Sequence, residues 1–135
     1  MKLKVAEVGI GGISGAHIPA WTRMEDVELV AICDIRPEKM DRFDGRITAR
    51  KYTDFDEMLE KETFDILDIT LPTYMHADFA VKALNRGIHV ITEKPISLKR
   101  ADVARVYEAA EKNNRCFMVA HVLRFWPEYM YLKDC

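Results

Sequence analysis

Hydrophobic residues in this chain gather in six short runs, separated by longer segments in which apolar residues recur every three or four positions. Each run has the length of a strand, and the segments between the runs have the period of amphipathic helices. The second run is almost wholly apolar, which is typical of a strand covered on both faces. The predicted strands are residues 4–8, 27–33, 47–52, 64–70, 88–92 and 116–120.

Capping residues and apolar stripes place the helices between these strands. Asp54, followed three residues later by Glu57, is an N-cap signature. Gly87 is a typical residue for the end of the helix before it, and Ser97 is predicted to cap the last long helix. The predicted helices are the segment after the first strand, a short helix over residues 37–43, and helices over residues 55–61, 75–86 and 97–113.

Strands and helices therefore alternate along the whole chain. Because crossovers between parallel strands are right-handed, this alternation predicts an α/β fold with a doubly wound parallel sheet between two helical layers, the three-layer α/β/α arrangement. The simplest strand order is 3-2-1-4-5-6. In such sheets ligands bind at the carboxyl ends of the strands, where the order reverses between strands 1 and 4.

Composition narrows the class of protein. The 135 residues suffice for about one domain, and 20 basic against 22 acidic residues give a net charge of −2, so we expect neither nucleic acid nor an anionic membrane as a partner. The apolar runs are far shorter than a membrane span, and the first strand follows the initiating methionine too closely for a signal peptide. Cys33 and Cys116 are predicted to be buried in strands and Cys135 to be a free thiol, which favours a cytoplasmic location.

The turn after the first strand has the sequence Gly9-Ile10-Gly11-Gly12-Ile13-Ser14. A strand, a glycine turn and a helix can hold a pyrophosphate, because Gly9 permits the tight turn and Gly11 lets the backbone approach phosphate oxygens. The third glycine of the Gly-x-Gly-x-x-Gly pattern is replaced by Ser14, which is small enough for close packing. An ordinary glycine-rich turn is the alternative interpretation.

The second strand ends at Asp34, the expected place for a ribose-binding acid. A carboxylate there accepts hydrogen bonds from both ribose hydroxyls and repels a 2'-phosphate, which favours NAD over NADP. Arg36 leaves NADP possible, because it can stack on adenine or pair with a 2'-phosphate; the alternative is a solvated arginine at the start of a helix.

The fifth strand ends in Glu93-Lys94-Pro95. A lysine at the carboxyl end of a buried strand lies where open α/β sheets carry out their chemistry. His76, just after the fourth strand, either touches the cofactor or only packs, and His17 is interpreted as structural. Arg124, beyond the last strand, either reaches the cleft or forms a structural ion pair.

Taken together, these motifs resemble the N-terminal dinucleotide-binding domain of the Gfo/Idh/MocA oxidoreductases, the glucose-fructose oxidoreductase and inositol dehydrogenase family. The likeness covers nearly the whole chain. It rests on the glycine turn with His17 after it, Asp34, Leu71-Pro72-Thr73-Tyr74-Met75-His76, Glu93-Lys94-Pro95 and Arg124-Phe125-Trp126-Pro127. The chain has Leu71-Pro72-Thr73 where the family commonly has Thr-Pro-Asn.

The resemblance implies roles for individual residues. Lys94 is the implied catalytic residue, which hydrogen-bonds the substrate oxygen during hydride transfer, and the Lys94-Pro95 bond is expected to be cis. Glu93 is expected along the nicotinamide ribose and Tyr74 at the wall of the nicotinamide pocket. The predicted cofactor-binding residues are Gly9, Gly11, Gly12, Ile13, Ser14, Asp34, Ile35, Arg36, Thr70, Leu71, Pro72, Tyr74, His76, Glu93, Lys94 and Arg124; no metal site is expected.

The resemblance also implies an organisation and a function. Residues 1–122 are expected to form the dinucleotide-binding domain and residues 123–135 to begin the connection to a substrate domain that the chain lacks. We expect an NAD-dependent dehydrogenase acting on a secondary alcohol of a sugar or cyclitol, this chain alone being inactive, and a homo-oligomer is possible. A non-catalytic NAD(P)-binding module is the alternative, and an S-adenosylmethionine methyltransferase fits worse because its chemistry has no use for Glu93-Lys94-Pro95.

Overall fold

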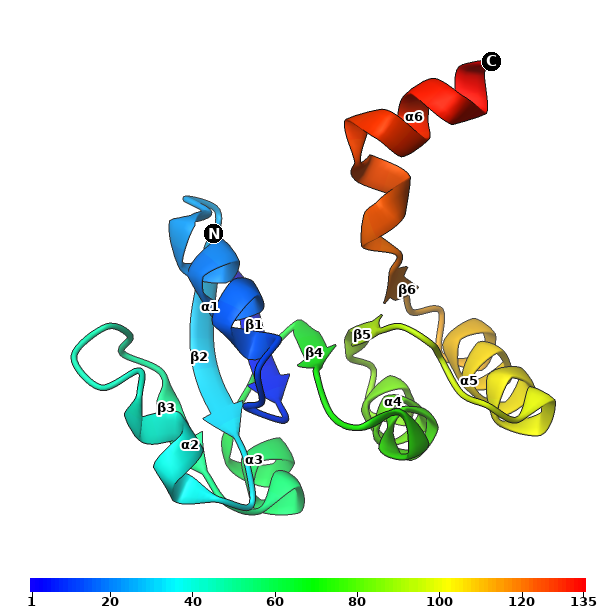
Figure 1. Ribbon diagram of the computed structural model, residues 1–135. Helices are drawn as coiled ribbons and strands as arrows, with labels where there is room; N and C mark the ends of the chain where they lie inside the picture. The colour runs from blue at the N-terminus through cyan, green and yellow to red at the C-terminus, as the bar shows by residue number, and fades with distance from the viewer.

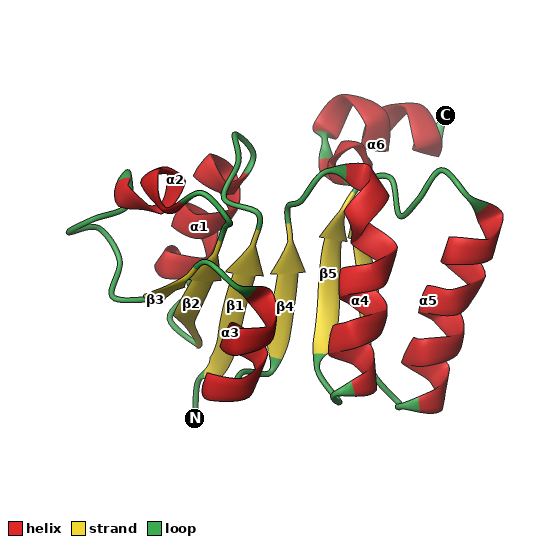
Figure 2. Ribbon diagram, turned by 90° about the horizontal axis from the view of Figure 1, so that it is seen from below, coloured by secondary structure: helices red, strands yellow, loops and turns green.

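A computed structural model describes all 135 residues as a six-stranded parallel sheet between helices (Figures 1 and 2). The strand order β3-β2-β1-β4-β5-β6 confirms the predicted topology. The strands are β1 (Leu3–Val8), β2 (Val27–Cys33), β3 (Arg50–Tyr52), β4 (Ile66–Ile69), β5 (His89–Glu93) and β6 (Phe117–Ala120). The helices are α1 (Ser14–Arg23), α2 (Pro37–Asp41), α3 (Phe55–Lys61), α4 (His76–Asn85), α5 (Arg100–Lys112) and α6 (Pro127–Asp134), with 3₁₀ turns η1 (Thr73–Met75) and η2 (Val122–Phe125).

The two faces of the sheet have separate cores. Helices α3, α4 and α5 cover one face, where the larger apolar cluster lies, and α1 and α2 cover the β1–β3 part of the other face (Figure 2). Successive residues of a strand point to opposite faces. In β1, Ala6 and Val8 therefore join the larger cluster, whereas Val5 joins the smaller one.

Several local predictions are confirmed. Asp54 caps α3, because its carboxylate accepts a hydrogen bond from the backbone N–H of Glu57 at 2.8 Å. Gly87 follows the end of α4 with a φ of +77°, in the left-handed region that glycine adopts without strain. The buried face of α4 is also as predicted, with Ala80, Ala83 and Leu84 fully covered.

Other local predictions are wrong. Helix α5 begins at Arg100, so Ser97 does not cap it; the Ser97 hydroxyl instead accepts from the N–H of Lys99 and donates to Asp102. Cys116 is exposed: it precedes β6, an edge strand that has no buried residue. Strand β3 is only three residues long, since Ile47 leaves the sheet to pack on the smaller core.

The end of the chain differs from the rest. Beyond β6, η2 and α6 stand away from the sheet (Figure 1) and bury none of their residues. Phe125 and Tyr131 are 74% and 71% exposed. No helix of the chain is both long and apolar enough to cross a membrane.

Candidate cofactor and active site

The glycine turn is held tightly against the start of the loop after β4. Gly9 has a φ of +92°, and a Cβ at this position would lie 2.7 Å from the backbone nitrogen of Leu71 and 2.8 Å from its Cα. Neither the conformation nor the space admits a side chain. A Cβ on Gly12 would meet nothing within 4 Å, so the turn is packed on one side and open on the other.

Helix α1 begins directly after this turn, with Ile13 at its N-cap and Ser14 as its first residue. Ser14 is fully buried, and its hydroxyl donates to the carbonyl of Gly11 at 2.6 Å. Serine therefore fits where the pattern usually has glycine. The Arg42 guanidinium also donates to the Ser14 hydroxyl and to the Gly11 carbonyl, a contact that the sequence reasoning missed.

Asp34 lies at the other side of the turn, after β2, and is only 7% exposed. One carboxylate oxygen accepts from the backbone N–H of Arg36 at 2.9 Å. The other lies 3.5 Å from the ammonium nitrogen of Lys39, a residue that the sequence reasoning did not select. Lys39 lies in α2, only five residues after Asp34, and this nearness along the chain was the one sequence signal for it.

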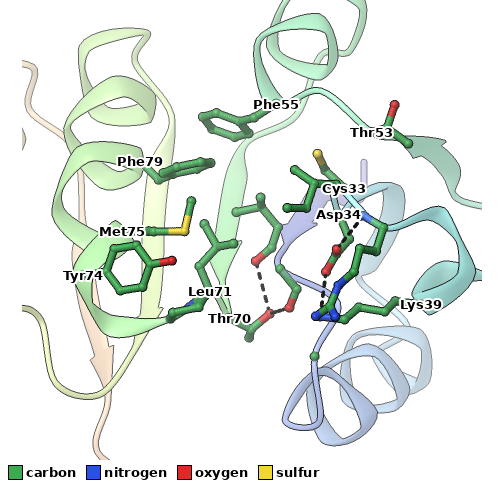
Figure 3. A pocket seen from close by; sticks show the side chains of 16 residues that line it. Cys33, Asp34, Lys39, Thr53, Phe55, Thr70, Leu71, Tyr74, Met75 and Phe79 are labelled. Atoms are coloured by element: carbon green, nitrogen blue, oxygen red, sulfur yellow. Dashed lines mark hydrogen bonds and ion pairs between the residues drawn. The ribbon is translucent and has the colours of Figure 1, made fainter.

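A cavity of about 680 Å³ opens between Asp34 and the loop after β4 (Figure 3). One wall is polar, with Asp34 and Lys39, and the opposite wall is apolar, with Phe55 and Phe79 in contact at a ring centroid distance of 4.6 Å. Tyr74 stands at the rim, 81% exposed. Of the predicted residues, the cavity is lined by Gly9, Gly11, Asp34, Ile35, Arg36, Thr70, Leu71, Pro72 and Tyr74.

Burial also sets the chemistry of Cys33 in this cavity. It raises the pKa of the thiol to about 12, so the sulfur is a protonated, unreactive wall atom at neutral pH.

Glu93 and Lys94 end β5 outside this cavity, at the same carboxyl edge of the sheet. The Lys94-Pro95 bond is cis, as the resemblance implied, and Lys94 is exposed. His76 is buried and packs instead of lining the cavity: its ring nitrogens lie 2.8 Å from the Pro95 carbonyl and 2.7 Å from the Leu71 carbonyl. It thus joins the loops that follow β4 and β5.

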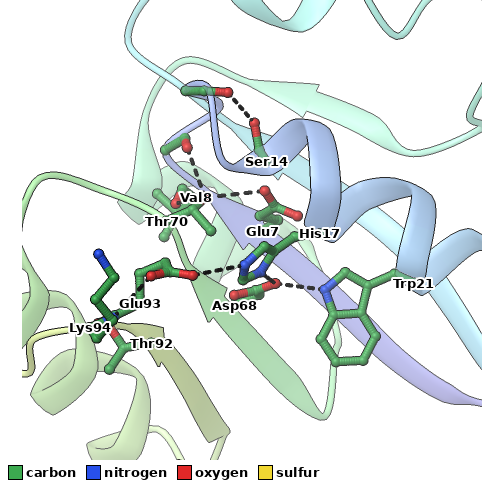
Figure 4. A network of polar contacts seen from close by, with 12 residues as sticks. Glu7, Val8, Ser14, His17, Trp21, Asp68, Thr70, Thr92, Glu93 and Lys94 are labelled. Carbon is green, nitrogen blue, oxygen red and sulfur yellow. Dashed lines mark hydrogen bonds and ion pairs between the residues drawn. The ribbon is translucent and has the colours of Figure 1, made fainter. Parts of the chain in front are cut away.

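A buried polar network lies under α1, on the face opposite the cavity (Figure 4). Glu7 of β1 and Asp68 of β4 are paired in the sheet register, point toward α1 and are fully buried. His17 of α1 contacts Asp68 at 2.8 Å and Glu93 at 3.1 Å, and Trp21 donates to Asp68 at 2.6 Å. Thr70 lies 3.1 Å from Glu7 and donates to the Gly9 carbonyl at 2.8 Å, which connects the network to the glycine turn.

Burial and neighbouring charge shift the acids and bases of this network. Burial, followed by the charge of Asp68, raises the pKa of Glu7 well above its usual value, so its carboxyl is neutral over a wide pH range. The hydrogen bond to Asp68, opposed by burial, raises the pKa of His17 to about 9. The sequence reasoning interpreted His17 as structural and missed the acids that it contacts, Asp68 and Glu93.

Part of the signal for this network was present in the sequence. Glu7 and Asp68 are the only acidic residues of β1 and β4, and the structure pairs them in the sheet register. Arg124, by contrast, is exposed on η2, lies outside the cavity and takes part in none of the ion pairs of the chain.

The sequence is similar to several dehydrogenases. It is 34% identical to inositol 2-dehydrogenase of Salmonella typhimurium over 99% of this chain and 41% of that protein. It is 31% identical to D-apiose dehydrogenase of Paraburkholderia graminis over 93% of this chain and 34% of that protein. The chain therefore spans less than half the length of these relatives.

Solved structures are similar over the same part of their length. The WlbA dehydrogenase of Bordetella pertussis, in complex with NADH and UDP-GlcNAcA, is 28% identical with a TM-score of 0.94, over 99% of this chain and 41% of that one. The scyllo-inositol dehydrogenase of Lactobacillus casei, with bound NAD(H) and scyllo-inositol, is 26% identical with a TM-score of 0.91, over 99% and 40%. The profile described as "Oxidoreductase family, NAD-binding Rossmann fold" matches residues 3–121, and the chain belongs to this Gfo/Idh/MocA family.

Proposed function

We propose that this chain binds NAD(H) along the carboxyl edge of its sheet and serves hydride transfer to or from a secondary alcohol of a sugar or cyclitol. One observation carries the proposal: the glycine turn, closed to side chains on one side and open on the other, lies between a buried carboxylate at Asp34 and an exposed lysine at the end of β5. The substrates of the relatives, inositol and apiose among them, support the substrate class.

The residues present fit a dinucleotide. The backbone amides of Gly12 and Ile13, at the N-terminus of α1, have no backbone acceptor and suit a pyrophosphate, whereas the Gly11 amide donates to the Gly9 carbonyl at 2.7 Å and shapes the turn. The Asp34 carboxylate suits the adenosine ribose, and the adjoining cavity has the size of ordinary small-molecule sites. The ammonium of Lys39 beside Asp34 supports use of NADP(H) as a second cofactor.

Lys94 is the proposed catalytic residue. NAD, when bound, supplies the acceptor for a hydride. The Lys94 ammonium donates a hydrogen bond to the substrate oxygen and stabilises the negative charge that develops on it. The hydroxyl proton must pass to a base, and the one carboxylate that lines the cavity, Asp34, is assigned to the ribose.

We therefore propose that residues 1–122 form the dinucleotide-binding domain and that residues 123–135 begin the connection to a substrate domain carrying that base. The shares of the relatives' length that this chain covers support this division. The exposed aromatic side chains of η2 and α6 support it also, since apolar patches of this kind mark interaction surfaces.

Calorimetric titration of the chain with NADH, NADPH and S-adenosylmethionine tests the cofactor assignment. We expect both dinucleotides to bind and S-adenosylmethionine not to bind. A chain that binds none of them contradicts the proposal, and one that prefers S-adenosylmethionine identifies a different class of enzyme.

The role of Lys94 is tested by joining this chain to the remainder of an inositol 2-dehydrogenase relative and measuring turnover. Lys94→Ala is expected to lower kcat by about 10²- to 10⁴-fold and to change NADH affinity less than about threefold, because the ammonium acts on the substrate oxygen. Lys112→Ala, an exposed lysine at the end of α5, is the matched control. If both variants turn over equally, the protein is better described as a non-catalytic NAD(P)-binding module.

A further inference from the structure

A continuous chain of polar contacts links the buried centre of the sheet to the backbone of Lys94 (Figure 4). His17 Nδ1 lies 2.8 Å from Asp68 Oδ2, and His17 Nε2 lies 3.1 Å from Glu93 Oε1. The other oxygen of Glu93 accepts a hydrogen bond from the backbone N–H of Lys94 at 3.1 Å. Glu93 thus joins the histidine to the residue assigned to catalysis.

Both partners of the His17 ring are carboxylate oxygens, which accept hydrogen bonds and cannot donate them when ionised. The ring satisfies both partners only as an imidazolium, with a proton on each nitrogen. The raised pKa of His17, about 9, agrees with this protonation state at neutral pH.

The inner end of the chain of contacts is fixed. Asp68 is fully buried in a central strand, and the same oxygen that contacts His17 also accepts from the Trp21 indole at 2.6 Å. The charged or titratable groups that face His17 are Glu7 on β1, Asp68 on β4 and Glu93 on β5. Glu93 is the only one of these three that is not fully buried, so it is the one that can move.

We propose that His17 is a positioning residue, whose imidazolium holds the Glu93 carboxylate against the Lys94 backbone and so fixes the reactive lysine. A neutral ring keeps one N–H, and the shorter contact to Asp68 retains it. Loss of the second proton therefore releases Glu93, which makes the position of Lys94 depend on pH. The catalytic role of Lys94 rests on the function proposed above, whereas the contacts that join His17, Glu93 and Lys94 are a property of this chain alone.

The coupling is measurable by NMR without cofactor or turnover. We expect the backbone amide of Lys94 and the imidazole nitrogens of His17 to titrate together, with a midpoint near pH 9. In His17→Gln this step in the Lys94 amide shift should vanish, and hydrogen exchange at that amide should become about tenfold faster, as expected for loss of a charge-supported hydrogen bond. His89→Gln, at the opposite end of β5, should leave both unchanged.

Glu93→Gln provides a second variant, should His17→Gln fail to fold. It keeps the contact between His17 and Asp68 and removes the carboxylate in between. His17 should still titrate, at a lower midpoint, while the Lys94 amide no longer follows it. A Lys94 amide that does not follow His17 in the unsubstituted chain, or that still follows it in Glu93→Gln, overturns the proposal. A chain that passes this test and fails to bind NADH contradicts the proposed function alone.

Discussion

The two faces of the sheet meet at the same carboxyl edge, but apolar side chains line one face there and a network of buried polar side chains lies on the other. On the α3 and α4 side an apolar wall, with Phe55 and Phe79, faces an open cavity. On the α1 side, Glu7, Asp68 and His17 are sealed from solvent or nearly so. Because the cavity is open, its residues can exchange water for a ligand, whereas the sealed charges stabilise or destabilise the fold itself.

This difference predicts which property of the protein a substitution on each face should change. Substitutions in the cavity should change ligand affinity with little effect on folding. Substitutions in the network should change stability and its dependence on pH. One contact joins the two faces, since the Thr70 hydroxyl lies between Glu7 and the Gly9 carbonyl.

Gly9→Ala is expected to have the largest effect, because Gly9 belongs to both regions. Its added Cβ would lie 2.7 Å from the Leu71 nitrogen, in a backbone conformation that alanine rarely adopts. We expect NADH affinity to fall more than about 100-fold and the free energy of unfolding to fall by about 3 kcal/mol, measured by calorimetry and urea denaturation.

Gly15→Ala is the control for that substitution. A Cβ at this position in α1 meets nothing within 4 Å, and alanine is favoured over glycine in helices by about 1 kcal/mol. It should leave the chain as stable or more so. Equal NADH affinity in Gly9→Ala and the unsubstituted chain would show that the turn does not hold the dinucleotide.

The fold and half of this comparison could be predicted from the sequence. Alternating apolar runs and helical periods determine a doubly wound sheet, and such sheets leave few places for a ligand, so Gly9 and Asp34 were found in the cavity region. The network could not be found the same way. A strand's alternation says that Glu7 and Val5 share a face, but not that His17 from a later helix covers it.

The other features that the sequence did not predict depend on distances between groups that lie on different elements. Lys39 was missed because an ion pair with Asp34 depends on how α2 leaves β2, which no local pattern encodes. Cys116 was predicted one residue too far into the strand, because the end of a strand depends on its neighbour: the Cys116 carbonyl still accepts from the N–H of Val90 at 3.0 Å, but the register of β6 with β5 begins at Phe117.

The network face is tested by the dependence of stability on pH. The pKa of His17 is raised from 6.5 in the unfolded chain to about 9 in the folded one. Its contribution is therefore fully present below pH 6.5 and is lost as pH rises through 9. Allowing for solvent screening at this partly covered side chain, the loss is about 2 kcal/mol.

Urea denaturation at several pH values between 6 and 10 measures this loss. His17→Gln should be less stable than the unsubstituted chain at pH 6, and the difference should shrink toward pH 10. The pKa of Glu7 is also raised, so ionisation of Glu7 lowers the stability of the folded chain as pH rises. This effect is present in both His17→Gln and the unsubstituted chain. A difference that stays constant with pH would show that His17 is not an imidazolium in the folded chain.

The smallest expected effect sharpens the cavity side of the comparison. Lys39 is partly exposed, and its ammonium lies 3.5 Å from Asp34, where a 2'-phosphate on the adenosine ribose would be bound. Lys39→Gln should weaken NADPH binding about three- to tenfold, as expected for one exposed charge contact, and change NADH binding less than about twofold. Lys61→Gln, which removes an exposed ion pair on α3, should change the affinity for neither dinucleotide.

Asp34→Ala should act in the opposite sense. It should weaken NADH binding about tenfold through lost hydrogen bonds, while relieving the repulsion of the 2'-phosphate of NADPH. If Lys39→Gln weakens the binding of both dinucleotides equally, Lys39 holds Asp34 in place and does not select the cofactor. If the free energy of unfolding stays constant across these variants, the residues of the cavity, unlike those of the network, can be altered without loss of the fold.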